Sequence, residues 1–278
     1  MSNASNNGLK LEILLATMNR TSLDFLTHLF PEANFLDFNI LIINQTTEDK
    51  LLKSDYDNIK VINAFEKGLS KSRNLAIKNA TGDVCLLADD DVKYKKGFSE
   101  IITKAFNTYK SAAIITFKMQ DFEGNDFRSY SNKKSHDLET IKNVNSVVIS
   151  FNRKQIIKNN LWFDEAFGLG AIFKTADEYI FMRETFEKKL TVLFESKVIL
   201  SHPKFSSGQD NGSDTLLFAR AALYYKYSGF LGYLKLFKHL YLIKNEGYIK
   251  GSEFIKKFKT GLKGINHYKM LIKTNKHD

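Results

Sequence analysis

Three consecutive aspartates, Asp89, Asp90 and Asp91, follow the apolar run VCLLA at residues 84–88. Like charges placed side by side repel each other, so folding alone gives no reason for the triplet. Side chains alternate along an extended segment, which places Asp89 and Asp91 on the same face. Two carboxylates that converge suit a hard divalent cation bound together with substrate phosphates. The triplet therefore predicts a metal site for Mn²⁺ or Mg²⁺, with a solvated acidic turn as the alternative.

The segments that must position these residues are short apolar runs. Four runs of five or six residues lack polar alternation, which is typical of strands covered on both faces; they are residues 11–16, 39–44, 59–64 and 84–88. Segments of helical length lie between them, at 22–30 and at 70–82, the second with Ser70 as a candidate N-cap. The alternation predicts an α/β fold with a mostly parallel sheet.

Polar residues follow three of these predicted strands. In open α/β sheets, ligands bind beyond the carboxyl ends of the strands. The residues at those positions are Thr17, Asn19, Arg20, Gln45, Thr46 and the three aspartates. We expect them to meet at one edge of the sheet and to form the binding site.

The rest of the chain predicts more strands and then helices. Residues 112–117 and 145–150 are strand-like, and 191–202 resemble two short strands around a turn. From Asp214 onward the pattern is helical. We therefore expect a catalytic α/β domain at 1–210 and a helical, basic, aromatic extension at 211–278.

The stretch from Gly68 to Phe98 resembles the nucleotide-sugar core of glycosyltransferase family 2, which has the GT-A fold. The family shows an Arg-Asn pair, a helix that ends in Ala-x-Gly-Asp/Glu, an apolar strand and a DXD motif. This sequence has Arg73-Asn74, the stretch 80–83, and Asp89-x-Asp91 in that order. The stretch LLATMNR matches the family's first strand, which ends in Thr-x-Asn-Arg. The resemblance covers about residues 10 to 205.

The resemblance implies a role for each matching residue. Asp89 and Asp91 would hold the metal on the donor diphosphate, and Asp90 would lie near the ribose or the metal. Arg73 would lie near the nucleotide, Thr17 and Asn19 would line the base and ribose pocket, and Arg20 would belong to the nucleotide-sugar site. The family's second strand usually ends in Asp-Asp-Gly-Ser, whereas here it ends in Asn-Gln-Thr-Thr. Gln45 would then contact the base, and the choice of uridine is less certain.

Asp177 and Glu178 match the family's acidic pair beneath the acceptor, with Ala176 where a glycine usually stands. An inverting transfer needs one carboxylate to take the proton of the acceptor hydroxyl. The alignment favours Glu178 as that base, with Asp177 as the other candidate. The alternative is structural, because Thr175-x-x-Glu178 is also a capping box.

His202 follows a predicted strand, and a lone histidine is more often structural than a ligand. In many GT-A enzymes, however, a histidine at this point completes the metal site. The resemblance therefore implies that His202 joins Asp89 and Asp91 as a metal ligand.

The net charge of +10 is concentrated at the carboxyl end of the chain, where residues 211–278 hold 13 Lys/Arg and 4 Asp/Glu. A basic segment favours an anionic surface. The stretch 229–244 intersperses lysines with leucines and aromatic residues, so it predicts either a helix that lies on a membrane or one packed against the catalytic domain. No nucleic-acid recognition motif is present, and we expect no nucleic-acid partner.

One cysteine and no apolar stretch of spanning length favour a cytoplasmic protein, with peripheral contact to the inner face of the membrane as a further option. The expected function is metal-dependent, inverting transfer from a nucleotide-sugar, with UDP as the favoured nucleotide, to a surface polysaccharide, lipopolysaccharide or lipid-linked acceptor. Two other functions stay open: a nucleotidyltransferase that makes an activated sugar, and a non-catalytic nucleotide-sugar-binding scaffold.

Overall fold

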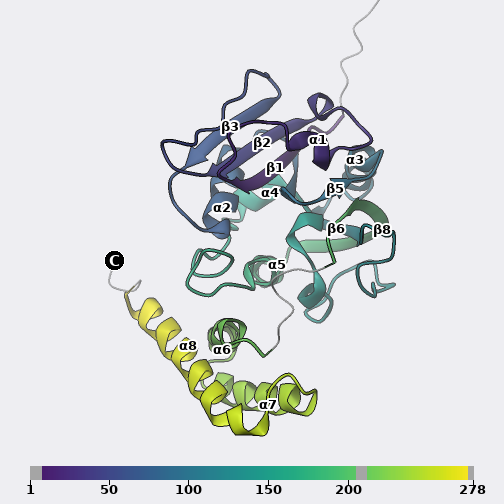
Figure 1. Ribbon diagram of the computed structural model, residues 1–278. Helices are drawn as coiled ribbons and strands as arrows, with labels where there is room; N and C mark the ends of the chain where they lie inside the picture. Colours follow the sequence, from purple (N-terminus) through teal and green to yellow (C-terminus); the bar gives the residue numbers. More distant parts are fainter. Residues whose placement is uncertain (1–7, 205–211, 275–278) are drawn as a thin grey trace, which may run out of the picture. The chain divides into compact units, whose positions relative to one another are not determined.

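The computed structural model describes residues 8–204 and 212–274. These form two compact units (Figure 1). The first, here called the sheet unit, contains residues up to 163 and residues 178–204. The second, here called the helical unit, contains residues 164–177 and the described residues from 212 onward. The boundary predicted near residue 210 lies outside the described residues, and the sequence did not indicate that 164–177 group with the carboxyl-terminal helices.

The sheet unit is built on one eight-stranded sheet with the order β3-β2-β1-β4-β7-β6-β8-β5. Its strands are β1 (Leu11–Met18), β2 (Asn39–Gln45), β3 (Ile59–Ala64), β4 (Val84–Asp89), β5 (Lys93–Tyr94), β6 (Ala112–Gln120), β7 (Ile149–Asn152) and β8 (Thr191–Ser201). Strands β3, β2, β1 and β4 run parallel, and β7 runs antiparallel to β4 and β6. The α/β fold with a largely parallel sheet is confirmed.

The helices of the sheet unit are α1 (Leu26–Leu29), α2 (Leu69–Asn79), α3 (Phe98–Thr108), α4 (Arg153–Lys158) and most of α5 (Asp177–Glu187), with the 3-10 turns η1 (Phe35–Asp37), η2 (Thr140–Asn143) and η3 (Ser146–Val148). Helix α2 packs on β1 and β2, and α3 packs on β1, β6 and β8. The central strands are buried, so their continuous apolar sequences reflect cover on both faces.

The four predicted amino-terminal strands are confirmed, and several later elements differ from expectation. The helix expected at 22–30 is reduced to the single turn α1. Helix α2 begins after Gly68, whose φ of 136° is unfavourable for other residues, and Ser70 is buried within the helix instead of capping it. Residues 146–148 form η3 before β7 begins at Ile149. The two short strands expected at 191–202 form one strand, β8. Its pairing with β6 contains several register shifts.

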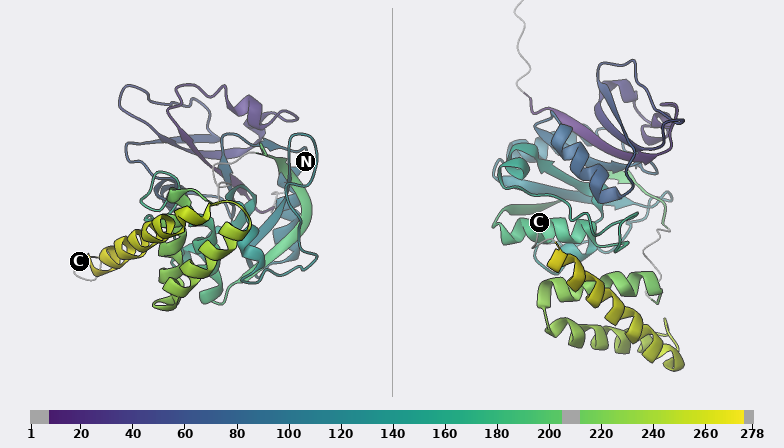
Figure 2. Two further views of the ribbon diagram at one scale, coloured as in Figure 1. Left: turned by 60° about the horizontal axis from the view of Figure 1, so that its bottom comes forward. Right: turned by 90° about the vertical axis from the view of Figure 1, so that its left-hand side faces the viewer.

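The helical unit consists of α6 (Asp214–Ser228), α7 (Leu231–Asn245), the turn η4 (Gly251–Glu253) and α8 (Phe254–Thr274). Figure 2 shows α8 lying across the other two helices. Their shared core contains Leu217, Leu236, Leu240 and Ile265. No helix in the described ranges is both long enough and apolar enough to cross a lipid bilayer.

Residues 164–177 belong to the helical unit through aromatic and ionic contacts. The rings of Phe167 and Phe173 stack at 4.7 Å, and Phe173 stacks on Phe218 of α6 at 5.3 Å. Lys226 of α6 pairs with Asp164 at 3.0 Å, and both side chains are largely buried. The unit therefore combines three carboxyl-terminal helices with a loop that precedes α5 in the sequence.

Candidate active site

The parallel pairing of β1 with β4 brings the predicted residues to one edge of the sheet. Ala16 of β1 lies opposite Asp89, the last residue of β4. Thr17 follows Ala16, and Asp90 follows Asp89. The hydroxyl of Thr17 donates to Oδ2 of Asp90 at 2.5 Å. Residues 73 positions apart in the sequence therefore meet where the two strands end.

Arg20 closes this contact from the turn after β1. Its Nε and Nη2 donate to the same Oδ2 of Asp90, at 3.0 and 2.7 Å. Its guanidinium also lies over the ring of Phe25, at 4.8 Å from the centroid. Asp90 is therefore compensated by a cation of the protein itself. Its carboxylate positions Arg20 at the edge where a ligand would lie.

The turn that carries Asn19 and Arg20 is fixed by β2. Asn19 has a φ of 54°, and its N–H donates to the carbonyl of Gln45 at 2.9 Å. The fully buried Asn44 accepts from the N–H of Arg20 and donates to its carbonyl, each at 3.0 Å. Sequence reasoning did not select Asn44. A buried amide at the end of an apolar strand was the available signal, because such a group needs hydrogen-bond partners.

Gln45 is buried, and its Oε1 accepts from the N–H of Gly68 at 2.8 Å. Gly68 precedes the first residue of α2, so this bond ties the end of β2 to the helix that carries Arg73. A contact between Gln45 and a nucleotide base would have to come from its amide NH₂ group. The next residue, Thr46, donates its hydroxyl to the carbonyl of Lys50 at 2.6 Å and shapes the loop after β2.

Arg73 extends from α2 beneath the acidic triplet. Its guanidinium is buried, and Nη2 donates to Ser146 Oγ at 2.7 Å and to Asp89 Oδ1 at 3.3 Å. It also lies over the ring of Phe163, at 5.4 Å. The neighbouring Asn74 exchanges two hydrogen bonds with the backbone of Phe163. The Arg-Asn pair therefore anchors the floor of the site, and Ser146 is a member that the sequence did not reveal.

Asp91 lies beside His202 because β5 pairs with β8. Lys93 is opposite Ser201 and Tyr94 is opposite Leu200, which brings the residues flanking these strands together. Nε2 of His202 is 3.7 Å from Oδ1 of Asp91, and 55% of the Asp91 side chain is exposed. The His202 Nδ1 is 2.7 Å from the carbonyl of Pro203. A carbonyl only accepts, so Nδ1 holds a proton, and Nε2 is the ring nitrogen that faces the carboxylate of Asp91.

This arrangement fits two ligands of a divalent cation. A metal-binding histidine normally donates its other ring N–H to a carbonyl, which fixes the tautomer. Asp89 differs, since its Oδ1 faces Arg73. Within the two described ranges, no three His, Cys, Asp or Glu side chains are grouped closely enough to hold a metal. Asp91 and His202 could therefore hold an ion whose other ligands come from a diphosphate and water.

Asp177 and Glu178 begin α5, and they differ in exposure. Asp177 is buried, whereas Glu178 is half-buried. The pKa of Arg128 is lowered, because burial disfavours its charge more than the nearby Tyr130 and Glu178 favour it. The carboxylate of Glu178 therefore lies within electrostatic reach of Arg128. Neither acid takes part in the contacts described above, so their catalytic role stays a prediction, as does the capping-box alternative for Glu178.

The family model for "Glycosyl transferase family 2" matches residues 20–181, which is more than half of the chain. The chain belongs to this glycosyltransferase family. The matched range includes Arg73, the acidic triplet, and Asp177 with Glu178, and it leaves out Thr17, Asn19 and His202. No curated protein matches the sequence significantly.

Several solved structures have a similar fold. S. aureus TarS 1-349 has a TM-score of 0.58 at 15% identity, over 92% of this chain and 81% of that chain. TarS 1-349 in complex with UDP-GlcNAc has a TM-score of 0.58 at 14% identity, over 92% of this chain and 82% of that one. TarS 1-349 in complex with UDP has a TM-score of 0.54 at 16% identity, over 90% and 80%. This glycosyltransferase therefore has the GT-A fold.

Proposed function

We propose that the protein is a metal-dependent, inverting glycosyltransferase that uses a UDP-linked sugar. Its acceptor would be a hydroxyl of a surface glycan or a lipid-linked saccharide. Membership of family 2 supports sugar transfer, and two of the structures with a similar fold are complexes of TarS with UDP-GlcNAc and with UDP. The observation that carries the proposal is the pair formed by Asp91 and His202 at the carboxyl edge of the sheet.

Asp91 and His202 would hold Mn²⁺ or Mg²⁺, which when bound neutralises the charge of the leaving diphosphate. Arg73 keeps Asp89 in place beneath this position through the 3.3 Å contact. Arg20, which Asp90 orients, presents its partly exposed guanidinium at the same edge and would bind the nucleotide. Thr17, Asn19 and the NH₂ group of Gln45 would then contact the ribose and the base.

Glu178 would take the proton from the acceptor hydroxyl while the oxygen of that hydroxyl attacks the anomeric carbon, and the bond from this carbon to the diphosphate breaks so that UDP leaves. Binding holds the two substrates in line, and the product has inverted anomeric configuration. Arg128 lies within electrostatic reach of Glu178, so a cation of the protein is close to the proposed base. Asp177 is the other candidate for this role.

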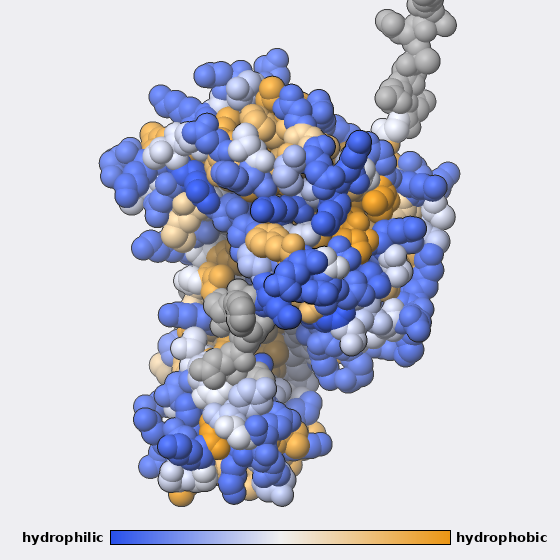
Figure 3. Space-filling model, turned by 45° about the vertical axis from the view of Figure 1, so that its right-hand side comes forward, coloured by the Kyte–Doolittle hydropathy of each residue, from blue (hydrophilic) through white to orange (hydrophobic). Residues whose placement is uncertain are grey.

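We also propose that α7 lies on the surface of an anionic membrane. Leu236, Leu240 and Ile243 are buried on one face of the helix, and the opposite face exposes Leu234 and Phe237. Residues 231–245 contain three exposed lysines and no acid. Figure 3 shows apolar side chains at the surface of the helical unit among hydrophilic ones. A helix with apolar residues and lysines on its outer face suits the boundary between lipid headgroups and acyl chains.

Ligand-induced thermal stabilisation tests the donor and metal together. UDP-, GDP- and CMP-sugars are screened with Mn²⁺ or Mg²⁺, since a ligand that binds only the folded state raises the melting temperature. We expect a UDP-sugar with metal to raise the melting temperature of the protein. In the Asp91→Asn variant, the part of this rise that depends on the metal should be lost. The matched control is Asp37→Asn, which changes an exposed aspartate before the amino end of β2. A metal-dependent shift that persists in Asp91→Asn contradicts the metal assignment.

A further inference from the structure

A small cavity in the sheet unit lies between β6, the loop at residues 127–136, the turns η2 and η3, and β8. Its volume of about 80 Å³ has room for about three water molecules, or for a single polar substituent of a larger ligand. Six hydroxyl-bearing side chains line it: Thr116, Ser129, Tyr130, Ser131, Ser135 and Thr140. Arg128 and Lys133 also line it, and no lining residue in this part of the described chain is Asp or Glu.

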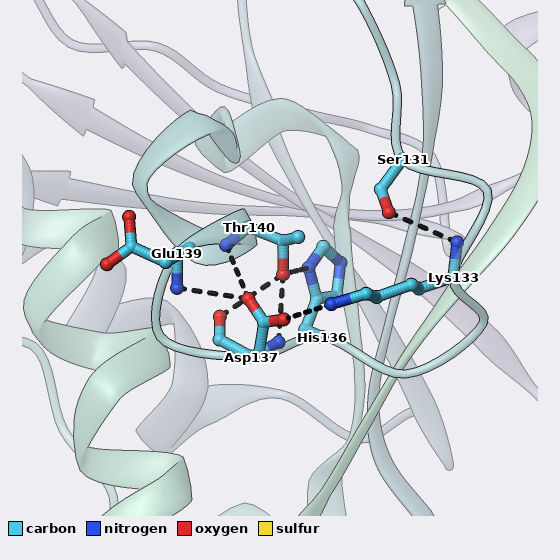
Figure 4. A network of polar contacts seen from close by, with 6 residues as sticks. All are labelled: Ser131, Lys133, His136, Asp137, Glu139 and Thr140. Atoms are coloured by element: carbon cyan, nitrogen blue, oxygen red, sulfur yellow. Dashed lines mark hydrogen bonds and ion pairs between the residues drawn. The ribbon is translucent and has the colours of Figure 1, made fainter.

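His136 forms one wall of the cavity. Its Nε2 is 2.6 Å from the hydroxyl of Thr116, and its Nδ1 is 3.1 Å from the hydroxyl of Thr140. Burial lowers the pKa of His136 to about 4, so the ring is neutral near pH 7. Figure 4 shows His136 beside Thr140, with Lys133 on the neighbouring part of the loop. The wall is therefore a neutral polar surface fixed by two hydroxyl groups.

Asp137 fixes the loop from outside the cavity. It accepts from the N–H groups of Glu139 and Thr140 at 3.0 and 2.8 Å, and from Nζ of Lys133 at 2.9 Å (Figure 4). The backbone bond from Thr140 and the bond from Lys133 hold the pKa of Asp137 well below its usual range. The carboxylate of Asp137 is therefore bound into this turn, and Asp137 is not among the residues that line the cavity.

Arg128 is the less exposed of the two cationic side chains in the lining. Its side chain donates to the carbonyl of Asn143 and to Oδ1 of Asn145, and both partners are neutral. Neither hydrogen-bond partner neutralises this partly buried guanidinium, so it keeps an attraction for an anion in addition to its electrostatic interaction with Glu178. Because the cavity has cations and hydroxyl groups and lacks carboxylates in its lining, an anionic, hydroxylated ligand suits it.

The cavity adjoins both halves of the proposed reaction centre. Asn145, which holds Arg128, precedes Ser146, which holds Arg73 beneath Asp89. On its other side Arg128 lies within electrostatic reach of Glu178. An acceptor that reaches the proposed base from this direction would pass the cavity.

The apolar part of the lining includes two aromatic rings. Tyr130 and Phe194 stack with their centroids 5.8 Å apart and their planes at 8°, and both line the cavity. Binding sites commonly combine an aromatic surface with a few polar groups that fix orientation. The volume is small for a whole saccharide, so the cavity would receive the charged substituent while the ring lies at its mouth.

We propose that this cavity is an acceptor subsite for a sugar unit that carries an anionic group, either a carboxylate or a phosphate. The inference rests on the proposed function, because it names the chemical class of the acceptor for that reaction. Arg128 binds the anionic group, Lys133 contributes at the rim, and the hydroxyl groups take the hydroxyls of the sugar.

NMR of protein that carries ¹³C-labelled histidine tests the two proposals in one sample. His136 reports on the cavity and His202 on the donor site, and His136→Gln and His202→Gln variants assign their signals. The probes are glucuronate, inorganic phosphate and glucose for the cavity, and UDP with Mg²⁺ for the donor site. We expect glucuronate or phosphate to shift the His136 signals saturably and glucose to leave them unchanged. The stronger of the two anions identifies the substituent as a carboxylate or a phosphate.

Substitutions of the two cationic side chains test whether the cavity binds anions specifically or holds only water. Arg128→Met should weaken anion binding by about tenfold or more, as expected for a charge-assisted hydrogen bond. Lys133→Met should weaken it less and keeps the test valid if Arg128→Met fails to fold. Lys142→Met is the matched control, since Lys142 is an ion-paired lysine of the same region that does not line the cavity.

The outcomes distinguish this inference from the proposed function. If UDP with Mg²⁺ moves the His202 signals and neither anion moves those of His136, the subsite is overturned while the donor site stands. Equal binding of glucose and glucuronate, or undiminished anion binding in both cavity variants, also overturns it. Failure of His202 to respond to UDP with Mg²⁺ counts against the proposed function instead.

Discussion

Each aspartate of the triplet has a different cationic or polar neighbour. Asp89 faces Arg73, Asp90 faces Arg20, and Asp91 lies beside His202. Two of the three negative charges are therefore compensated within the protein by guanidinium groups, which reduces the repulsion between adjacent carboxylates. The third is mostly exposed and is the one that a metal ion would compensate. The three residues thus have separate roles even though they are adjacent in the sequence.

Glu178 is the residue whose change should slow turnover most. We expect Glu178→Gln to lower the rate of UDP release from a UDP-sugar by at least about a hundredfold, because a general base contributes about 10²- to 10⁴-fold. Donor binding, measured by thermal shift, should be unchanged. Glu187→Gln is the control, since Glu187 is an exposed glutamate at the end of the same helix.

Asp177→Asn is measured in parallel with Glu178→Gln. A large loss in Asp177→Asn with little effect of Glu178→Gln would transfer the role of the base to Asp177. If neither substitution slowed turnover, the acidic pair would not supply the base.

Ala176 has a φ of 72°, a left-handed conformation that costs a residue with a Cβ about 1–2 kcal/mol. This is the position at which the resemblance to family 2 implies a glycine, and the backbone here has a conformation that glycine adopts easily. We expect Ala176→Gly to raise the free energy of unfolding by about 0.5–1 kcal/mol, after the entropic cost of a glycine is subtracted. Chemical denaturation measures it. Ala105→Gly, in the interior of α3, should instead lower stability.

At the scale of elements, the pairing of β8 determines which residues meet at the candidate site. It pairs with β6 on one side and with the two-residue strand β5 on the other. The pairing with β5 is what places His202 beside Asp91. The N–H of His202 also donates to the carbonyl of Gln120, at the end of β6. A histidine from late in the chain is thereby held on two strands that come much earlier.

Helices α6 and α8 approach closely because α8 has a glycine at their crossing. A Cβ added to Gly264 would overlap the backbone carbonyl of Phe218, which cannot move without moving α6. We expect Gly264→Ala to lower the stability of the helical unit by about 2–3 kcal/mol, despite the higher helix propensity of alanine. Hydrogen exchange of peptides from α6 and α8 measures this.

Gly261→Ala is the matched substitution for this crossing. The atoms nearest to a Cβ at Gly261 all belong to the side chain of Leu236, with Cδ1 at 2.5 Å, Cδ2 at 2.7 Å and Cγ at 3.1 Å, and a side chain can shift more readily than backbone. Its effect should be clearly smaller than that of Gly264→Ala. Equal effects of the two substitutions would mean that the backbone contact at Phe218 is not what sets the helix spacing.

At the scale of the whole molecule, the charge is unevenly distributed. Nearly all of the net charge of +10 comes from residues 211–278, which hold 13 Lys/Arg and 4 Asp/Glu. The helical unit also exposes large apolar side chains on α7, with exposed fractions of 62% for Leu234 and 53% for Phe237. Basic charge and apolar surface on the same helix support contact with an anionic lipid surface.

Vesicle sedimentation tests this contact. We expect the protein to bind vesicles that contain phosphatidylglycerol and not vesicles of phosphatidylcholine alone, and added salt should weaken binding because it screens the lysines. Leu234→Ser combined with Phe237→Ser should weaken binding by about tenfold or more, since two exposed apolar anchors are lost. Ile255→Ser, at an equally exposed site on α8, is the control. Binding that is unaffected by both salt and the double substitution contradicts the proposal.

The sequence alone determined the class of fold, the first four strands and the family. Apolar runs such as residues 39–44 are local patterns, and burial on both faces leaves them few alternatives to a central strand. The sequence also indicated the triplet and the Arg-Asn pair, because their spacing is set by one strand–helix–strand unit. It did not reveal Asn44 or Ser146 as partners of Arg20 and Arg73, since those contacts link segments tens of residues apart.

Only the tertiary structure decided which side chains meet. The separation of Asp91 from His202 along the chain is large, and their proximity follows from the pairing of β5 with β8, which no local pattern encodes. The grouping of residues 164–177 with the carboxyl-terminal helices likewise depends on aromatic packing between distant segments. Residue types specify what chemistry is available, but long-range strand pairing and packing, which depend on the free energy of the whole fold, determine where that chemistry is assembled.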